Sequence, residues 1–452
     1  MLIPNREKCK HRAGCSPPAL DRARWTNPTL FHNNLKMSRK LLIALVCAGV
    51  LVLAGGSFTA SLILTKARGV HSAAAADPAG ISASSAQPAG AQSDRSADER
   101  LHTGTNHLLS LTFAGDIMAH EINSSHRPYD PIYAGVAPEL KASALTFGNL
   151  ELTVDDELPL AGYPLFNVHT DYLQAAVEAG FNVFSVANNH VGDYGEAGVR
   201  KTYALLDRMR AADGIAFSGI RPDEETQFAP VTINVAGWKI GFLAVTELLN
   251  RGQAAGLVNI VDYRDPHRRS EFLSELKRIT PDYDLFILSV HGGVEYALTP
   301  DPQKIAFFRQ AVEAGVSIVW SQHPHVLQPW ELMSVGRRTA LIISSNGNFV
   351  SGQISEIDPA KPWIARAYTG DSALFSVRVE RAGGAATVAS VEPLLISSFR
   401  NGRSQMVVRP LALLAAEELP APWHDYYAYR YRVMSRLVHA SQGSLLGQTS
   451  AP

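Results

Sequence analysis

Five apolar segments of this sequence each end in a short cluster of carboxylate, amide or imidazole side chains. In residues 181–195, a run of β-branched and aromatic residues stops at Asn188, Asn189 and His190, and a helical pattern begins near Glu196. The same arrangement of an apolar run and a polar cluster recurs at residues 111–116, 144–151, 285–291 and 318–325. Carboxylate, amide oxygen and imidazole together form the ligand set of Mn, Fe, Zn or Mg ions, and a pair of such ions can activate water. The residue types therefore predict a metal-dependent site.

The candidate ligands are expected to converge, because in an open α/β sheet ligands bind outside the carboxyl ends of the strands. Each cluster alone has a plainer interpretation, since Asn and Gly-Asp pairs also make turns. Five clusters of the same kind favour one shared site for one or two divalent ions. The predicted metal ligands are Asp116, Asn149, Glu151, Asn189, His291, His323 and His325.

Two of the histidines, His323 and His325, are one residue apart after an apolar strand. We expect this segment to be extended, so that both imidazoles point to the same side, with Pro324 stiffening the chain between them. A buried, hydrogen-bonded core histidine is the alternative for either residue alone. His291 precedes two glycines, which allow the backbone to approach a ligand closely, although a simple strand-to-loop turn would look the same.

The segments between the clusters predict an α/β protein. Three hairpins are expected, in residues 230–247, 332–345 and 373–394, each centred on a glycine. Helical patterns cover residues 173–179, 199–211, 268–279, 303–314 and 423–437. The first strand is expected at residues 108–114, closed by Gly115 and Asp116. Mixed sheets with helices on the outside follow from this order.

Composition excludes several classes of function. The chain has 452 residues, 46% of them hydrophobic, and a formal net charge of −1, with no run of Lys or Arg beyond its N-terminal part. Nucleic acid is therefore not an expected partner. Cys9, Cys15 and Cys47 are the only cysteines, so later residues cannot form a disulfide, a zinc–thiolate site or a cysteine nucleophile.

The N-terminal part predicts a membrane anchor. Residues 41–64 carry no charge and are long enough to cross a bilayer, and Arg39 and Lys40 precede them. The positive-inside tendency then places residues 1–40 in the cytoplasm and the rest outside. A cleaved signal peptide, with small residues at 73–76, is the alternative. Translation could also start at Met37, which would make residues 1–36 an artificial extension.

The rest of the chain divides into three parts by composition. Residues 65–106 are rich in Ala, Ser, Gly and Pro and are expected to be a disordered linker. A single domain is expected at residues 107–400, followed by a C-terminal helix and tail at 401–452. This layout is that of a single-pass protein of the cell membrane with its folded domain outside the cytoplasm.

Six motifs, taken in order, resemble a known family: LTFAGDIM, FGNLE, ANNHVGDYG, VHGGVEY, HPHVLQPWE and ISSNGNFV. They are similar to those of the capsule-synthesis CapA family, which is associated with poly-γ-glutamate production and related to calcineurin-like metallophosphatases. The resemblance covers about residues 109–349. It implies a four-layer α/β/β/α sandwich of metallophosphatase-like type with a two-metal site at one edge.

The resemblance also implies roles for single residues. Asp116 would be the first aspartate ligand, Asn149 and Glu151 would stand where a bridging aspartate does, and Asn189 would bind metal beside the catalytic His190, which would protonate or stabilise the leaving oxygen. The remaining ligands would be His291, His323 and His325. One departure is that metallophosphatases usually have a histidine two residues after the first aspartate, where this chain has Met118.

Three functions are compatible with the sequence. The first is a metal-dependent hydrolase that acts on a phosphoester or a γ-glutamyl amide, with Asn188, Glu295 and Asn348 expected to contact the substrate. The second is a non-catalytic binding or export component of a capsule-polymer machine, with an anionic polymer and other capsule subunits as partners. The third, a structural envelope protein without a ligand, fits the polar strand ends poorly.

Overall fold

The computed structural model describes residues 108–223, 227–382 and 385–443. The expected cytoplasmic segment, anchor and linker at residues 1–40, 41–64 and 65–106 lie outside these residues. Among the helices that are described, none is both long and apolar enough to cross a bilayer. All the described residues fall within one compact unit, and their hydrophobic core lies between Leu109 and Val438.

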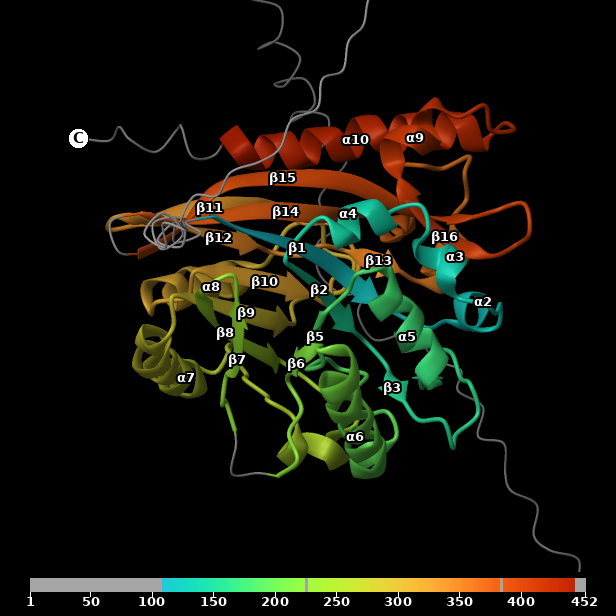
Figure 1. Ribbon diagram of the computed structural model, residues 1–452. Coiled ribbons are helices and arrows are strands. Elements are labelled where there is room, and N and C mark those ends of the chain that lie inside the picture. Colours follow the sequence, from blue (N-terminus) through green and yellow to red (C-terminus); the bar gives the residue numbers. More distant parts are fainter. Residues whose placement is uncertain (1–107, 224–226, 383–384, 444–452) are drawn as a thin grey trace, which may run out of the picture. The chain divides into compact units, whose positions relative to one another are not determined.

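The larger of two mixed sheets has the strand order β16-β15-β14-β1-β2-β5-β6, with β13 pairing with β1 (Figure 1). Its strands are β1 (Leu108–Ile117), β2 (Leu145–Leu150), β5 (Val183–Ser185), β6 (Ala216–Ser218), β13 (Asn348–Val350), β14 (Asp371–Ala382), β15 (Ala385–Arg400) and β16 (Met406–Pro410). β1, β2, β5 and β6 are parallel neighbours. Their carboxyl ends therefore lie at one edge.

The smaller sheet has the order β11-β12-β10-β9-β8-β7. Its strands are β7 (Val231–Val235), β8 (Trp238–Thr246), β9 (Leu285–His291), β10 (Ile318–Gln322), β11 (Trp330–Val335) and β12 (Arg338–Ile343), and a separate pair is formed by β3 (Thr153–Val154) and β4 (Asn167–Val168). The pairs β7–β8, β11–β12 and β14–β15 are antiparallel, which confirms the three predicted hairpins.

The two sheets pack face to face. The ring of Phe147 on β2 lies 5.5 Å from that of Phe242 on β8 and 5.8 Å from that of Trp320 on β10. The indole of Trp320 donates to the Ala114 carbonyl at 2.9 Å, and the hydroxyls of Ser289 and Ser185 are 2.9 Å apart. These contacts bring the ends of β1, β2 and β5 opposite those of β9 and β10.

Helices cover the outer faces (Figure 1). α7 (Pro266–Ile279) and α8 (Pro302–Glu313) pack on the smaller sheet, and α5 (Thr170–Ala179), α6 (Gly195–Asp213), α9 (Leu411–Ala416) and α10 (Trp423–Gly443) contribute to the core of the larger one. Shorter helices are α2 (Glu121–Ser124), α3 (Asp130–Tyr133), α4 (Ala137–Lys141), η1 (Gly252–Leu257), η2 (Thr280–Asp282), η3 (Gly352–Glu356) and η4 (Ala365–Gly370). α7 and α8 start alike, with Asp265 or Asp301 accepting from two backbone N–H groups and proline next in sequence.

Two boundaries differ from the sequence prediction. β1 continues to Ile117 instead of ending at Ala114, because β13 pairs in parallel with its end. Gly115 makes this approach possible, since a Cβ there would lie 1.8 Å from the Gly347 carbonyl oxygen. Beyond residue 400, β16 continues the larger sheet by pairing with β15, and α10 runs to Gly443. Residues 406–410 are therefore part of the larger sheet rather than of a separate tail.

A buried ion pair fixes α10 on that sheet. The Arg430 guanidinium contacts the Asp371 carboxylate at 2.6 Å, and both side chains are 0% exposed. Burial raises the pKa of Asp371, and the charge of Arg430 opposes this rise. The guanidinium therefore offsets part of the desolvation cost of the buried carboxylate.

Arg430→Met is expected to destabilise the fold by about 3–5 kcal/mol, because it leaves a buried carboxylate without its counter-charge. The pKa of Asp371 would rise further in the variant, so the loss should be full above that pKa and shrink as the pH falls through it. Denaturant unfolding at several pH values measures both effects. The exposed Arg432→Met is the control, and a small, pH-independent loss in Arg430→Met would contradict the prediction.

Candidate metal centre

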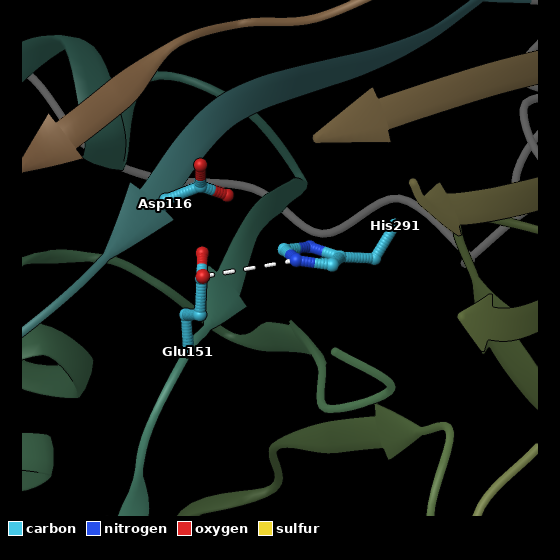
Figure 2. Close-up of side chains that lie close together, drawn as sticks. All are labelled: Asp116, Glu151 and His291. Carbon is cyan, nitrogen blue, oxygen red and sulfur yellow. Dashed lines mark ion pairs between the residues drawn. The ribbon is translucent and has the colours of Figure 1, made fainter. Parts of the chain in front are cut away.

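The predicted strand ends meet where the two sheets face each other. Asp116 lies near the end of β1, Glu151 follows β2 directly and His291 is the last residue of β9. Figure 2 shows the two carboxylates and the imidazole facing one another. Each offers a ligand atom within 4.8 Å of the other two, and all three side chains are fully buried. The structure thus brings together three predicted ligands from different strands.

Two amides complete this cluster. The Asn189 Oδ1 lies 2.7 Å from the His291 Nε2, which in turn is 3.7 Å from Glu151 Oε1. The Asn149 Nδ2 lies 2.8 Å from Asp116 Oδ1 and 3.2 Å from His291 Nδ1. Nitrogen and oxygen of an amide can exchange places by a flip, so Asn149 can present either atom to the cluster.

His323 and His325 lie at the cluster, as predicted, but with a backbone conformation that differs from the prediction. β10 ends at Gln322, and the two residues have φ of 99° and 58°, so they form a left-handed turn and the expected extended conformation is wrong. The His323 ring still lies 5.0 Å from that of His291, and His325 Nδ1 lies 3.2 Å from Asp116 Oδ2. Positive φ is strained for a histidine, and such strain concentrates at functional sites.

The cluster fits a divalent cation. Within the described part of the chain, three of its buried atoms have no hydrogen-bond partner: Glu151 Oε1, Asn149 Oδ1 and His323 Nδ1. Buried polar atoms are normally satisfied, and each exception calls for an explanation such as an ion. These atoms are a carboxylate oxygen, an amide oxygen and an imidazole nitrogen, which is a suitable donor set for a first-row divalent ion.

Burial also sets the protonation of the cluster. Desolvation, with added repulsion from Asp116, raises the pKa of Glu151 well above its usual range. Desolvation and the neighbouring imidazoles hold the pKa values of His291 and His323 well below theirs. The two imidazoles are therefore neutral at pH 7, which is the form that binds metals.

His190 stands beside the cluster at the wall of a cavity. Its Nδ1 lies 2.8 Å from Asp193 Oδ2, and this carboxylate also accepts from the Phe166 backbone N–H at 2.9 Å. Asp193 is fully buried, so it can hold the imidazole in one orientation. Asp193 is not among the residues predicted from the sequence. Its position three residues after His190, within one turn, was the available signal.

The three predicted substrate contacts lie in different environments. Asn188 is buried, donates to the Leu150 carbonyl and accepts from the His190 backbone N–H. Asn348 is also buried, and its Oδ1 is 3.0 Å from His325 Nδ1. Asn188 therefore holds the backbone of His190, and Asn348 holds the imidazole of His325. Glu295 is exposed and lines the cavity.

The cavity beside the cluster has a volume of about 620 Å³ and is lined by His190 and His325 on the side of the cluster. His120, four residues after Asp116, also lines it and was not selected from the sequence. Burial, with His325 and His190 nearby, lowers the pKa of His120 to about 4, so its imidazole is neutral.

A buried lysine supports the loop after His291. The Lys304 Nζ donates to the Gly292 carbonyl at 2.9 Å, and Glu247 Oε2 accepts from the Gly293 N–H at 2.9 Å. Lys304 is fully buried, which lowers its pKa to about 7. No sequence signal marks Lys304, because it looks like an ordinary surface position of α8.

A family model for the bacterial capsule synthesis protein PGA_cap matches residues 110–353, which contain every residue of the cluster. The chain belongs to this family. The resemblance noted from the motifs is thereby confirmed.

Curated relatives from two bacilli carry related names. The capsule biosynthesis protein CapA of Bacillus anthracis is 28% identical over 271 residues, 55% of this chain and 61% of the relative. The PGA biosynthesis protein CapA of Bacillus subtilis (strain 168) is 27% identical over 301 residues, 63% of this chain and 71% of the relative. The chain therefore spans less than two thirds of the first of these relatives. Among solved structures, the calcineurin-like phosphoesterase YfkN from Bacillus subtilis aligns with a TM-score of 0.34 and 15% identity over 64% of this chain and 90% of that one.

Proposed function

We propose that this member of the capsule-synthesis family is a metal-dependent hydrolase with the four-layer sandwich of a metallophosphatase. The observation that carries the proposal is the buried Asp116–Glu151–His291 cluster, in which Glu151 Oε1 has no hydrogen-bond partner, with His190 beside it at the wall of the 620 Å³ cavity. We call this cavity the catalytic cavity. A purely structural protein would not need buried acids and imidazoles at this place, since burying them costs stability.

The cluster would hold one or two divalent ions through Asp116, Glu151, His291, His323 and His325, with the amide oxygens of Asn149 and Asn189 as further ligands. Such an ion supplies Lewis acidity and lowers the pKa of a bound water. The protein's own contribution is position: Asn348 fixes His325, and Lys304 and Glu247 fix the loop that follows His291.

His190 would donate a proton from its Nε2. Asp193 accepts the hydrogen bond at Nδ1, which orients the ring and leaves Nε2 directed away from this carboxylate. In hydrolysis of a phosphoester or a γ-glutamyl amide, Nε2 would give its proton to the leaving oxygen or nitrogen as that bond breaks. His190 would then regain a proton from solvent through the catalytic cavity.

The alternative is a non-catalytic binding or export component of a capsule-polymer machine. One observation favours it: Met118, which lines the catalytic cavity, brings a thioether where a metallophosphatase has an imidazole ligand. In either case an anionic polymer and other capsule-synthesis subunits are proposed partners. The Bacillus subtilis relative is named for biosynthesis of PGA, which makes poly-γ-glutamate a candidate polymer.

A fragment from Leu101 onward tests the proposal, since the described core lies within it. Metal analysis of the purified fragment should find one or two divalent ions per chain. A screen of phosphoesters and γ-glutamyl amides should give turnover that a chelator abolishes. Stoichiometric metal without turnover on either class would favour the binding component instead.

We also propose that residues 41–64 anchor the chain with its folded part outside the cytoplasm. Protease added to intact spheroplasts is then expected to cut within residues 69–106 and release a fragment containing both sheets. Spheroplasts lysed before digestion serve as the control. Complete protection in intact spheroplasts, with cutting after lysis, would reverse the orientation.

A further inference from the structure

A second cavity, of about 680 Å³, lies next to the catalytic cavity. We call it the apolar cavity. Its walls come from η3, from the turn between β15 and β16, and from the segment that joins α9 to α10. Six of its lining side chains are Ile354, Ile357, Phe399, Met406, Trp423 and Tyr427. A cavity of this size and composition matches those that hold small organic ligands.

The two cavities are direct neighbours. Ile122 of α2 and Ser355 of η3 line both of them, and α2 and η3 are in contact. Ser355 is exposed and Ile122 is partly buried, so the boundary between the cavities reaches the surface of the protein. A ligand could therefore occupy both cavities by passing over this boundary.

Three charged residues line the apolar cavity: Arg400, Arg409 and Glu417. Arg400 is exposed, and the other two form an ion pair within the wall. Arg409 contacts Glu417 at 2.6 Å, and its guanidinium lies 5.8 Å from the centre of the Phe399 ring. Apart from Ile122, all the lining residues follow residue 353, where the match to the family model ends. The apolar cavity is therefore a feature of this chain's C-terminal part rather than of the matched region.

We propose that the apolar cavity binds a hydrocarbon chain of the substrate, while the polar group to be hydrolysed lies in the catalytic cavity. The substrate class is then an amphiphile, with an alkyl or isoprenoid chain joined to the scissile phosphoester or amide. This inference rests on the proposed hydrolase function. It explains why an apolar compartment adjoins a site whose own walls are polar.

Alkyl phosphates of increasing length test the inference. Ethyl, butyl and octyl phosphate are titrated calorimetrically, below their micelle concentrations, into the full chain in nanodiscs and into residues 92–452, with inorganic phosphate and empty nanodiscs as controls. Full burial is worth about fourfold in affinity per methylene, or about 4,000-fold for the six methylenes by which octyl phosphate exceeds ethyl phosphate. Burial of only two or three of them should still make octyl phosphate bind about thirtyfold more tightly. Equal affinity along the series, with inorganic phosphate still bound, would overturn the inference and leave the hydrolase proposal intact.

A matched pair of variants tests whether the hydrocarbon chain of the ligand lies in the apolar cavity. Leu419 lines the apolar cavity, so Leu419→Lys should flatten the dependence on chain length without changing the affinity for inorganic phosphate. Leu413, which is 56% exposed and does not line the cavity, gives the control Leu413→Lys, which should keep the wild-type dependence. An unchanged dependence in Leu419→Lys would overturn the assignment.

Chelation separates this inference from the hydrolase proposal. Removal of metal should lower the protein's affinity for every alkyl phosphate by a similar factor and preserve the dependence of affinity on alkyl length. If affinity still depends on alkyl length but does not change on chelation, the result would support the apolar cavity and count against the metal centre. If residues 92–452 bind octyl phosphate but the full chain does not, the N-terminal part covers the cavity and a substrate role is overturned. The same holds if octyl phosphate dissociates a dimer, because a second copy would then be the occupant.

Discussion

Replacing His323 and His325 together by alanine is expected to remove bound metal, from one or two ions per chain to less than about a tenth of that. His325 lies 3.2 Å from Asp116 and 3.9 Å from Glu151, and the His323 ring is 5.0 Å from that of His291, so the double change takes two imidazoles from one side of the cluster. Even the loss of groups that only support ligands costs 10–100-fold in metal affinity. Elemental analysis of the dialysed protein measures the effect.

The backbone at these two positions calls for a second variant. Both residues have positive φ, which alanine tolerates poorly and asparagine better. The double asparagine variant should therefore fold at least as well as the alanine one and still lose most of the metal. His267 and His424 are exposed histidines outside the cluster, and the variant with both replaced by alanine should keep its bound metal. Wild-type metal content in a folded His323/His325 variant would refute the site.

Much of this site was predictable because strand ends are easy to recognise. His291 ends β9 as the apolar run of residues 285–291 indicates, and Asp116 and Glu151 stand at or just after the ends of their strands. Parallel neighbours place Asp116 and Glu151 at the same edge of the larger sheet, and the packing of the two sheets brings His291 opposite them. The hairpins were predictable for a similar reason, since each glycine-centred turn separates two β-rich runs.

The missed features depend on contacts that are distant in sequence. β13 is three residues long, and it is a strand only because the end of β1 lies beside it. Lys304 reads as a surface lysine of a helix, and its burial becomes evident only when the loop after His291 packs over α8. Local pattern carries no information about such neighbours.

The backbone conformation at His323 and His325 was predicted wrongly for another reason. Alternation along an extended chain and a left-handed turn both allow residues two apart to face one site. The spacing therefore predicted the convergence correctly and the backbone wrongly. Pro324 lies between the two histidines and does not distinguish these cases, because its own φ is compatible with both.

Replacement of His190 by alanine is expected to lower turnover by about 10²–10⁴-fold, the usual contribution of positioned proton transfer. Metal content and the unfolding midpoint should stay near those of the wild type, because His190 lies beside the cluster rather than within the group of facing ligand atoms. Rates at saturating and at low substrate, together with elemental analysis, separate the loss of a proton donor from the loss of metal.

Asp193→Asn provides the matched test of how His190 works. Its carboxylate touches Nδ1 of His190 at 2.8 Å and not the substrate cavity, so the change should disturb the orientation of the ring while leaving the imidazole in place. A smaller loss of turnover is expected than in His190→Ala, together with a shifted pH–rate profile, since the amide cannot stabilise a protonated imidazole. Asp193 also accepts from the Phe166 N–H, so melting curves of this variant are needed to exclude a folding defect.

A folded, metal-loaded His190→Ala protein that hydrolyses its substrate at the wild-type rate would show that His190 has no chemical role. The non-catalytic binding component would then be the better account of the site.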